Sequence, residues 1–288
     1  MTALDAAPGE GKSAAEDEWT ENRPPRRGRP SLELREAWAH RDLGVVHAQR
    51  TLKVRYRQTM LGVGWALLQP IAGLVIFTIA FGRLAQLPSD GLPYPVFVYP
   101  AMCLWIYVST SVSAAAAELP QNPHLVTRVY FPRILSPAAA VVPGLVDFAL
   151  ALALTPILLV AYGVAPGPQV LLVPVWMAAA AVVAFGIGTW LAAINVKYRD
   201  VRYALPFLLQ SWFFLSPMVF PSSLVSDQWR VLYAVNPIVG LVDGLRWSLV
   251  NAPPPPLADI ASLMSAVVIV VSGLYYFRSA EVSFADVI

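Results

Sequence analysis

Charged side chains are scarce in this sequence. Only 13% of its 288 residues are Asp, Glu, Lys or Arg, whereas 57% are hydrophobic and the mean hydropathy is +0.58. A soluble domain carries about a quarter of charged residues, so the composition argues against a water-soluble globular fold. Several apolar runs approach the length of about 20 residues that an α-helix needs to cross a bilayer. The composition therefore indicates an all-α polytopic membrane protein.

Cysteine and histidine are also nearly absent. The single cysteine, Cys103, lies inside an apolar run, which excludes an intramolecular disulfide. The three histidines, His40, His47 and His124, are too few and too widely separated to indicate a metal site. We therefore expect this chain to hold no metal and no cofactor of its own.

The first 30 residues contain no hydrophobic run. They are rich in Ala, Gly, Pro, Glu and Arg, which predicts a disordered cytoplasmic tail over residues 1–30 and no cleavable signal peptide. Within this tail, Ala6–Ser13 reads AAPGEGKS and approaches the phosphate-binding pattern G-x-x-x-x-G-K-[ST]. That loop needs a buried strand before it, and none precedes this segment, so we do not expect it to bind nucleotide.

Residues 31–58 are predicted to form an amphipathic helix at the membrane surface. Ser31 can cap its N-terminus, and apolar residues such as Trp38 recur at helical spacing among arginines. A basic helix directly before an apolar run is expected to lie in the lipid headgroup plane. A soluble helix packed on a partner is the alternative. Arg55 and Arg57, at its end, could attract the pyrophosphate of a lipid carrier or simply anionic headgroups.

Residues 59–288 are predicted to form a membrane domain with six transmembrane helices. The apolar runs are about Met60–Gly82, Val96–Ala117, Ala138–Tyr162, Val170–Ile194, Ala204–Pro221 and Leu257–Phe277. With the N-terminus inside, the inner segments hold 17 of the 20 Lys and Arg residues, and the short inner loops hold five against one in the short outer loops. The positive-inside rule therefore predicts that both termini are cytoplasmic.

One inner loop stands out, residues 122–137, which we call the coupling loop. It reads NPHLVTRVYFPRILSP, a basic segment bracketed by prolines with an apolar face in its middle. A short amphipathic helix of this kind can fit a groove on a cytosolic protein and pass movement to the spans it joins. The residues assigned to this contact are Asn122, Pro123, Leu125, Arg128, Val129, Phe131, Pro132 and Arg133. A plain loop that anchors lipid headgroups is the alternative.

The longest outer segment, residues 222–256, contains a moderately apolar piece. Residues 236–250, NPIVGLVDGLRWSLV, are too few to span a bilayer and carry Asp243 and Arg246. Irregular backbone at membrane depth must be shielded by protein or line a wet cavity. We therefore expect a helical re-entrant or interfacial hairpin between the fifth and sixth spans.

Several patterns recur in an order that resembles a known family. They are Leu52–Pro70 (LKVRYRQTMLGVGWALLQP), the coupling loop, Asn195–Asp200 (NVKYRD), Ser216–Pro221 (SPMVFP) and Asn236–Arg246 (NPIVGLVDGLR). Each is weak alone, but their order and spacing over about Asp42–Phe277 resemble the permease subunits of ATP-binding-cassette exporters of lipid-linked polysaccharides, such as O-antigen, and of teichoic acids. Arg128 stands where that pattern usually has lysine, which keeps the charge.

The resemblance implies a partner arrangement and a location. Two copies of the chain would form a pathway for a polyprenyl-diphosphate-linked glycan in the bacterial cytoplasmic membrane, surrounded by membrane lipids. Two separate ATPase subunits, which bind ATP and Mg, would dock on the coupling loops. The chain itself would be a transport subunit, not an enzyme, and would bind no nucleic acid.

The resemblance also implies roles for two other segments. The helix at 31–58 would help to admit the lipid-linked polymer from the inner leaflet. The segment 222–256 would act as an outer gate. The residues assigned to this gate are Asn236, Pro237, Asp243 and Arg246.

Aromatic side chains are the groups that we expect to line the pathway. Their faces stack on the apolar faces of sugar rings without the cost of desolvating a charge. Trp105 and Tyr107 lie in the second predicted span, and Trp212 and Phe213 lie in the fifth. Interfacial belts and helix packing are the alternative roles for these four residues.

Other functions stay open from the sequence. A permease that exports a drug or a small lipid would use the same machinery. An enzyme acting on polyprenyl phosphates would need clustered acids on one membrane face to hold a metal and phosphates. The inner loops offer only Glu118 and Asp200, in different loops, which argues against the enzyme. A purely structural membrane partner would leave the matched patterns without a purpose.

Overall fold

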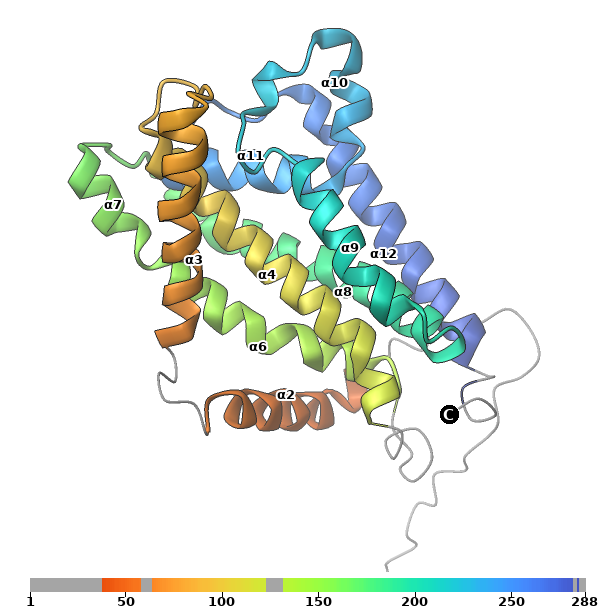
Figure 1. The fold of residues 1–288 in the computed structure, drawn as a ribbon. Helices are drawn as coiled ribbons and strands as arrows, with labels where there is room; N and C mark the ends of the chain where they lie inside the picture. Colours follow the sequence, from red (N-terminus) through yellow and green to blue (C-terminus); the bar gives the residue numbers. More distant parts are fainter. Residues whose placement is uncertain (1–37, 58–63, 123–131, 282–283, 285–288) are drawn as a thin grey trace, which may run out of the picture.

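The computed structural model describes residues 38–57, 64–122, 132–281 and 284, and every regular secondary-structure element within them is a helix. Five helical segments among the described residues are long and apolar enough to cross a membrane. They are Gly64–Leu84, Tyr94–Gln121, Leu135–Tyr162, Pro168–Lys197 and Leu257–Glu281. Figure 1 shows these segments gathered into one bundle. The predicted tail at 1–30 lies outside the described residues.

Helix α4 (Tyr94–Gln121) is the centre of the bundle. It packs against α6 (Leu135–Leu152) and α8 (Val173–Lys197), and the largest fully buried side chains on it are Phe97, Tyr99 and Tyr107. Prolines inside α4 are tolerated because neighbouring helices and local adjustments satisfy the freed backbone groups. A continuous core therefore surrounds the second predicted span.

The first predicted span is a helix at the edge of the bundle (Figure 1). Helix α3 (Gly64–Phe77) continues directly into a π-helix, Thr78–Leu84. Side chains such as Trp65 and Ile76 are exposed along it. Exposed apolar side chains over a span of this length suit a surface that faces lipid or another protein.

The third predicted span is broken into two helices. Helix α6 ends at Leu152, and α7 (Thr155–Tyr162) starts with Pro156 in its first turn. Proline has no N–H and disfavours a helical conformation in the residue before it, so the break falls where proline is best tolerated. Helix α7 then ends at Gly163, whose φ of +67° is a left-handed conformation that glycine adopts without strain.

The fifth predicted span is shorter than expected. Helix α9 (Val201–Phe214) has 14 residues, which gives a length of about 21 Å against a hydrocarbon core of about 30 Å. The chain leaves the helix at Leu215 and turns at Ser216, whose carbonyl accepts from Met218 N at 2.7 Å. Pro217 offers no N–H to continue the helix. The prediction of six long spans is therefore not confirmed, and five are found in the described residues.

Two short helices follow at one end of the bundle. They are α10 (Asp227–Ala234) and α11 (Pro237–Val250), joined at Asn236. Helix α11 lies across the ends of the other helices (Figure 1), and most of its side chains are buried. Asn251, at φ +56°, ends it, and an extended run of prolines leads to α12 (Ile260–Glu281). The structure thus has two helices in this segment, whereas the re-entrant or interfacial hairpin between the fifth and sixth spans stays a prediction.

The opposite end carries the helix that precedes the spans. Helix α2 (Arg41–Tyr56) lies across that end, next to α4 and α6 (Figure 1). It lies within the predicted range of 31–58, of which residues 31–37 and residue 58 are outside the described part. Its placement at a membrane surface stays a prediction.

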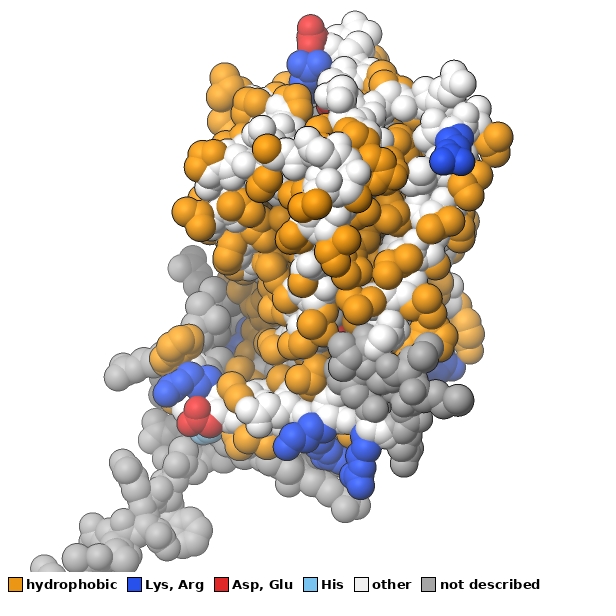
Figure 2. All heavy atoms as spheres, turned by 90° about the vertical axis from the view of Figure 1, so that its left-hand side faces the viewer, with side chains coloured by type: hydrophobic (Ala, Val, Ile, Leu, Met, Phe, Trp, Pro, Cys, Tyr) orange, Lys and Arg blue, Asp and Glu red, His pale blue; other side chains and the backbone are white. Residues whose placement is uncertain are grey.

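Figure 2 shows one face of the molecule, on which an apolar belt separates two polar ends. Lys and Arg side chains gather below the belt on this face, at the end that carries α2. At the other end the described cations are Arg83, Arg230 and Arg246. The prediction that the end with α2 faces the cytoplasm depends on this uneven distribution of Lys and Arg.

Gly244 is expected to tolerate no larger side chain. A Cβ placed there would overlap the ring of Trp176, which is held by a hydrogen bond from its Nε1 to Ser248 Oγ at 2.8 Å. We expect Gly244→Ala to lower the free energy of unfolding by about 1–3 kcal/mol, as overpacking does. Thermal unfolding in detergent measures this. The control is Gly44→Ala, whose Cβ would meet Leu135 at an ordinary 3.7 Å; an equal fall in both variants would contradict the account.

Candidate functional site

The coupling loop begins where α4 ends. Asn122 N–H donates to Glu118 O at 3.1 Å and to Leu119 O at 3.2 Å, which closes the last turn of the helix. The Asn122 side chain also donates from Nδ2 to Glu118 Oε1 at 2.9 Å. The first residue of the loop is therefore fixed to the last turn of α4. Pro123, Leu125, Arg128, Val129 and Phe131 lie outside the described residues, so the shape of the loop stays a prediction.

Glu118 connects the start of this loop to helix α2. Its Oε1 lies 2.8 Å from His47 Nε2, and both side chains are mostly buried. One carboxylate oxygen thus holds His47 of α2 and Asn122 of the loop together. Hydrogen bonds to a charged group are among the stronger ones in proteins. The structure therefore ties the helix before the spans to the first residue of the coupling loop.

The other end of the loop is tied to α12. Pro132 is buried, and Arg133 donates from Nη1 to the backbone oxygen of Glu281 at 2.8 Å. The Glu281 side chain is itself held by Arg278, at 2.7 Å. The end of the last transmembrane helix therefore contacts the last part of the coupling loop.

A small cluster of buried apolar residues packs next to both ends of the loop, at Leu119 and Ile134. It draws on three helices, α4, α8 and α12, and on one residue before α6 and one after α12. Its members are Leu119, Ile134, Ala192, Ala193, Val196, Phe277 and Phe284. Because protein interiors are close-packed, a displacement at the loop would be passed through this cluster to α4, α8 and α12.

Removal of the Glu118 carboxylate is expected to loosen α2. Glu118→Ala removes both acceptor contacts, and we expect amide hydrogen exchange in residues 44–51 to speed up about tenfold, the effect of losing one to two kcal/mol of local stability. Hydrogen–deuterium exchange with mass spectrometry measures this in the purified chain. Glu118→Gln, which keeps an acceptor oxygen, is the control. Unchanged exchange in the alanine variant would show that this contact does not hold α2.

Three of the four predicted pathway aromatics meet between α4 and α9. The ring centroid of Trp105 lies 5.8 Å from that of Trp212 and 5.7 Å from that of Phe213, in edge-to-face arrangements. Phe77 of α3 joins them, 5.5 Å from Phe213. Tyr107 is placed elsewhere, stacked on Phe148 of α6 at 5.1 Å. Trp105 and Phe213 are buried in this cluster and Trp212 is half-buried, whereas Tyr107 belongs to the packing of α4 on α6.

An apolar groove runs between α2 and α6. Its volume is ≈ 400 Å³, and it is lined by apolar residues such as Val45, Leu52 and Val142. Arg41 stands at its edge. Arg57, at the end of α2, is exposed, and the side chain of Arg55 lies outside the described part. This is a surface on which an apolar chain with an anionic head could rest.

At the other end of the bundle, Asn236 joins α9 to α11. Its Oδ1 accepts from Ile238 N at 3.1 Å, which caps α11, and from Trp212 Nε1 at 3.0 Å. Its Nδ2 donates to Ser216 Oγ at 2.8 Å. Pro237 occupies the first turn of α11, where its missing N–H has no cost. The side chain of the predicted gate residue Asn236 thus links α9 to α11, and through Trp212 it contacts the aromatic cluster.

Arg246 fixes α11 to α4 and to the turn after α9. It is 2% exposed, and it donates from Nε to Phe97 O at 3.0 Å and from Nη2 to Met218 O at 2.9 Å. Its guanidinium also lies 3.6 Å from the centre of the Phe97 ring. Burial lowers the pKa of Arg246 to about 10, and the charge of Asp243 opposes that shift. The side chain therefore stays charged at neutral pH.

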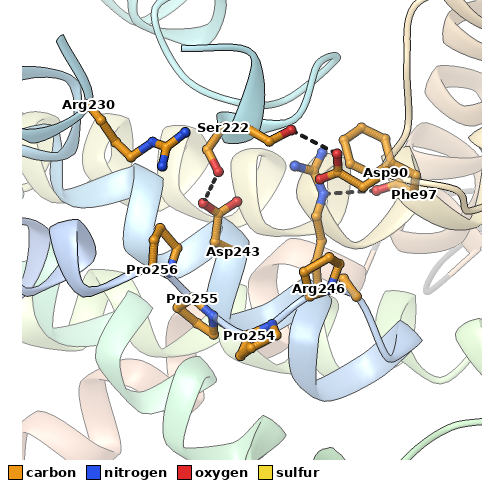
Figure 3. Close-up of a pocket in the computed structure, with 12 residues that line it drawn as sticks. Asp90, Phe97, Ser222, Arg230, Asp243, Arg246, Pro254, Pro255 and Pro256 are labelled. Atoms are coloured by element: carbon orange, nitrogen blue, oxygen red, sulfur yellow. Dashed lines mark hydrogen bonds between the residues drawn. The ribbon is translucent and has the colours of Figure 1, made fainter. Parts of the chain in front are cut away.

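Asp243 lies one turn before Arg246 and accepts a hydrogen bond from Ser222 Oγ (Figure 3). Burial raises the pKa of the Asp243 carboxyl, while the charge of Arg246 and the Ser222 hydroxyl lower it. The two predicted gate charges therefore lie on one face of α11, each held by a different partner.

Several of these contacts were not predicted. The link between Glu118 and His47 joins residues 71 positions apart, and nothing in the local pattern pairs them. Ser222 and Phe97 as partners of the gate charges were missed for the same reason. The sequence did indicate that the charged residues in the otherwise apolar segment 236–250 have partners, because a buried charge needs one. It did not indicate which residues these partners are.

Comparison with known proteins identifies the family of the chain. The chain is 31% identical to the O-antigen export system permease protein RfbA of Myxococcus xanthus over 257 residues, 88% of this chain and 98% of the relative. It is 22% identical to RfbA of Klebsiella pneumoniae over 86% of this chain and 95% of that protein. It is 23% identical to the polysialic acid transport protein KpsM of Escherichia coli over 81% and 91%. The model of the ABC-2 type transporter family matches residues 45–250. The chain therefore belongs to the ABC-2 type transporter family.

Proposed function

We propose that this chain is the membrane subunit of an ATP-driven exporter that moves a polysaccharide from the inner to the outer leaflet of the bacterial cytoplasmic membrane. The observation that carries the proposal is the match along nearly the full length of the Myxococcus O-antigen export permease. The likeness to a polysialic acid transport protein supports the broader class of polysaccharides rather than one sugar. We further propose that the polymer is carried on a polyprenyl diphosphate.

The energy for export is proposed to come from two separate ATPase subunits, which hold ATP and Mg. They would dock on the coupling loop, residues 122–137, of two copies of the chain. The contacts at both ends of this loop support the proposal: Asn122 reaches α2 through Glu118, and Arg133 reaches α12 through Glu281. Movement of a docked loop would be passed to helices on both sides of it.

A second copy of the chain is proposed to complete the pathway. Helix α3 exposes apolar side chains along a span, and the cluster of Trp105, Trp212 and Phe213 lies next to it through Phe77. Two such faces could form a wall on which sugar rings stack weakly and repeatedly, with the half-buried Trp212 as the accessible member of the cluster and the buried Trp105 and Phe213 packed behind it. In this arrangement Tyr107 supports the wall from behind, through its packing on Phe148.

The end of the bundle that carries α2 is proposed to face the cytoplasm, with both termini on that side. The groove between α2 and α6 would then lie at the inner leaflet, where it could hold an isoprenoid chain beside the pyrophosphate-attracting Arg55 and Arg57. The outer segment, with Asn236, Pro237, Asp243 and Arg246, would close the pathway on the far side.

The groove also favours a second candidate, export of a drug or small lipid, because its apolar lining would accept either. Deletion of the gene separates the candidates. The proposal predicts that the cell surface loses a polysaccharide while its lipid-linked form accumulates inside, protected from added glycosidase. Restoration by the intact gene is the control. Unchanged surface polysaccharide with a higher sensitivity to amphiphilic drugs would favour the second candidate, and loss of the lipid-linked form itself would point to an enzyme of its synthesis.

A further inference from the structure

A cavity opens beside α11 at the end of the bundle that carries the outer segment. Its volume is ≈ 390 Å³, within the range of about 300–1,000 Å³ that is usual for small-molecule sites. Its walls come from the link before α4, from the 222–223 turn, from α10 and α11, and from the prolines before α12. Figure 3 shows the polar side chains on one side of it and Pro254, Pro255 and Pro256 on another.

The polar wall holds hydrogen-bonding capacity that the protein does not use. Arg246, 2% exposed, lines the cavity, and its Nη1 has no hydrogen-bond partner within the described residues. A buried donor without a partner costs free energy, so such a group usually marks a position that a ligand or water completes. Asp243 and Asp90 add carboxylate acceptors, each held on one side by a serine hydroxyl, Ser222 and Ser223 respectively.

The charges that line the cavity identify the class of ligand. Two carboxylates, Asp90 and Asp243, are balanced by two cations, Arg230 and Arg246. An anion would meet both carboxylates, and a cation would meet both arginines, so neither is favoured. Neutral hydroxyl groups suit this wall, because a hydroxyl can accept from a guanidinium and donate to a carboxylate at the same time.

The proline wall suits the other side of such a ligand. Ala252 and Pro253–Pro256 present carbon atoms to the cavity. A sugar ring has an apolar face of C–H groups and an edge of hydroxyls. A cavity with one apolar wall and one wall of mixed donors and acceptors matches both features.

We propose that this outer cavity binds a neutral sugar ring of the exported polysaccharide as the polymer leaves the pathway. The identity of the sugar as exported cargo rests on the proposed function, whereas the existence of a sugar site rests on the cavity alone. Asp243 and Arg246 would hold the hydroxyls of one ring edge, and the prolines would cover its apolar face. The predicted gate charges would thus also recognise the cargo.

Saturation-transfer difference NMR tests this on the full chain in lipid nanodiscs. The probes are free glucose, galactose, mannose and rhamnose, with glucuronate as the acidic counterpart. Ala252→Trp is designed to fill the cavity without removing a hydrogen bond. Leu257→Trp, directly after this linker but 86% exposed and outside the cavity lining, is the matched control. Asp243→Asn removes a charge with little change of shape.

We expect at least one neutral sugar to bind the wild type and Leu257→Trp. Ala252→Trp should abolish binding, and Asp243→Asn should weaken it about tenfold, the usual effect of weakening one hydrogen bond to a charged group. Absence of binding by all four neutral sugars, equal binding by all variants, or tighter binding of glucuronate would overturn the proposal.

Capture of the ATPase by the same preparations separates this inference from the proposed function. A wild-type chain that captures the ATPase but binds no neutral sugar would overturn the cavity proposal alone. A chain that binds sugar at the cavity but captures no ATPase would support the sugar site and contradict the exporter.

Discussion

Replacing Arg246 by alanine is expected to destabilise the outer end of the bundle strongly. The substitution removes two hydrogen bonds from a buried charged donor, to the backbone oxygens of Phe97 and Met218. Each such bond contributes about 1.5–3 kcal/mol, so we expect a loss of about 3 kcal/mol or more. The two carbonyls lose a partner, and the buried Asp243 carboxyl loses the positive charge that opposes the rise of its pKa.

Thermal unfolding of the purified chain measures the loss, and Arg83→Ala is the matched control. Arg83 is a cation at the same end of the bundle, but it is exposed, so its removal should change stability little. Proteolysis would locate the effect, with new cleavage expected in residues 215–236. Equal stability of the two alanine variants would show that Arg246 does not hold α11 in place.

Replacing Val129 and Phe131 by aspartate is expected to abolish export. Both residues belong to the predicted apolar face of the coupling loop. If that face sits in a groove of the ATPase, each carboxylate must lose its water on docking, at a cost of several kcal/mol. Two such residues should weaken docking by more than about 100-fold. The amount of polysaccharide at the cell surface measures the result in cells.

The control for the loop is the variant Val129→Leu/Phe131→Leu, which keeps the face apolar and should export normally. Both variants should show the unfolding temperature of the wild type, because we assign these two side chains to docking and not to the packing of the bundle. Normal export by the aspartate variant would mean that this face is not the docking surface.

The sequence was sufficient for the class of fold, because length and apolarity decide which segments can cross a membrane. It also showed that the short apolar segment 236–250 carries Asp243 and Arg246, charges that need partners when they are buried. It could not indicate that Arg246 is held by backbone oxygens from α4 and the turn after α9. Such partners depend on how helices distant in sequence are packed.

The fifth span shows where apolarity alone is insufficient. The run Ala204–Pro221 is long enough to be counted as a span, but α9 ends at Phe214, before the Ser216–Pro217 turn. Hydropathy does not register that Pro217 has no N–H to donate. Similarly, Glu118 was considered only as a metal ligand, whereas the structure uses it to bind His47 and Asn122.

We propose above that a separate ATPase drives this chain through the coupling loop. The most direct test is capture of the ATPase encoded beside its gene by the detergent-solubilised wild-type chain and by Val129→Asp/Phe131→Asp, with ATP turnover recorded for both. We expect the wild type to capture the ATPase and the aspartate variant to capture none. A wild type that captures no ATPase, or capture that is the same for both chains, would contradict it.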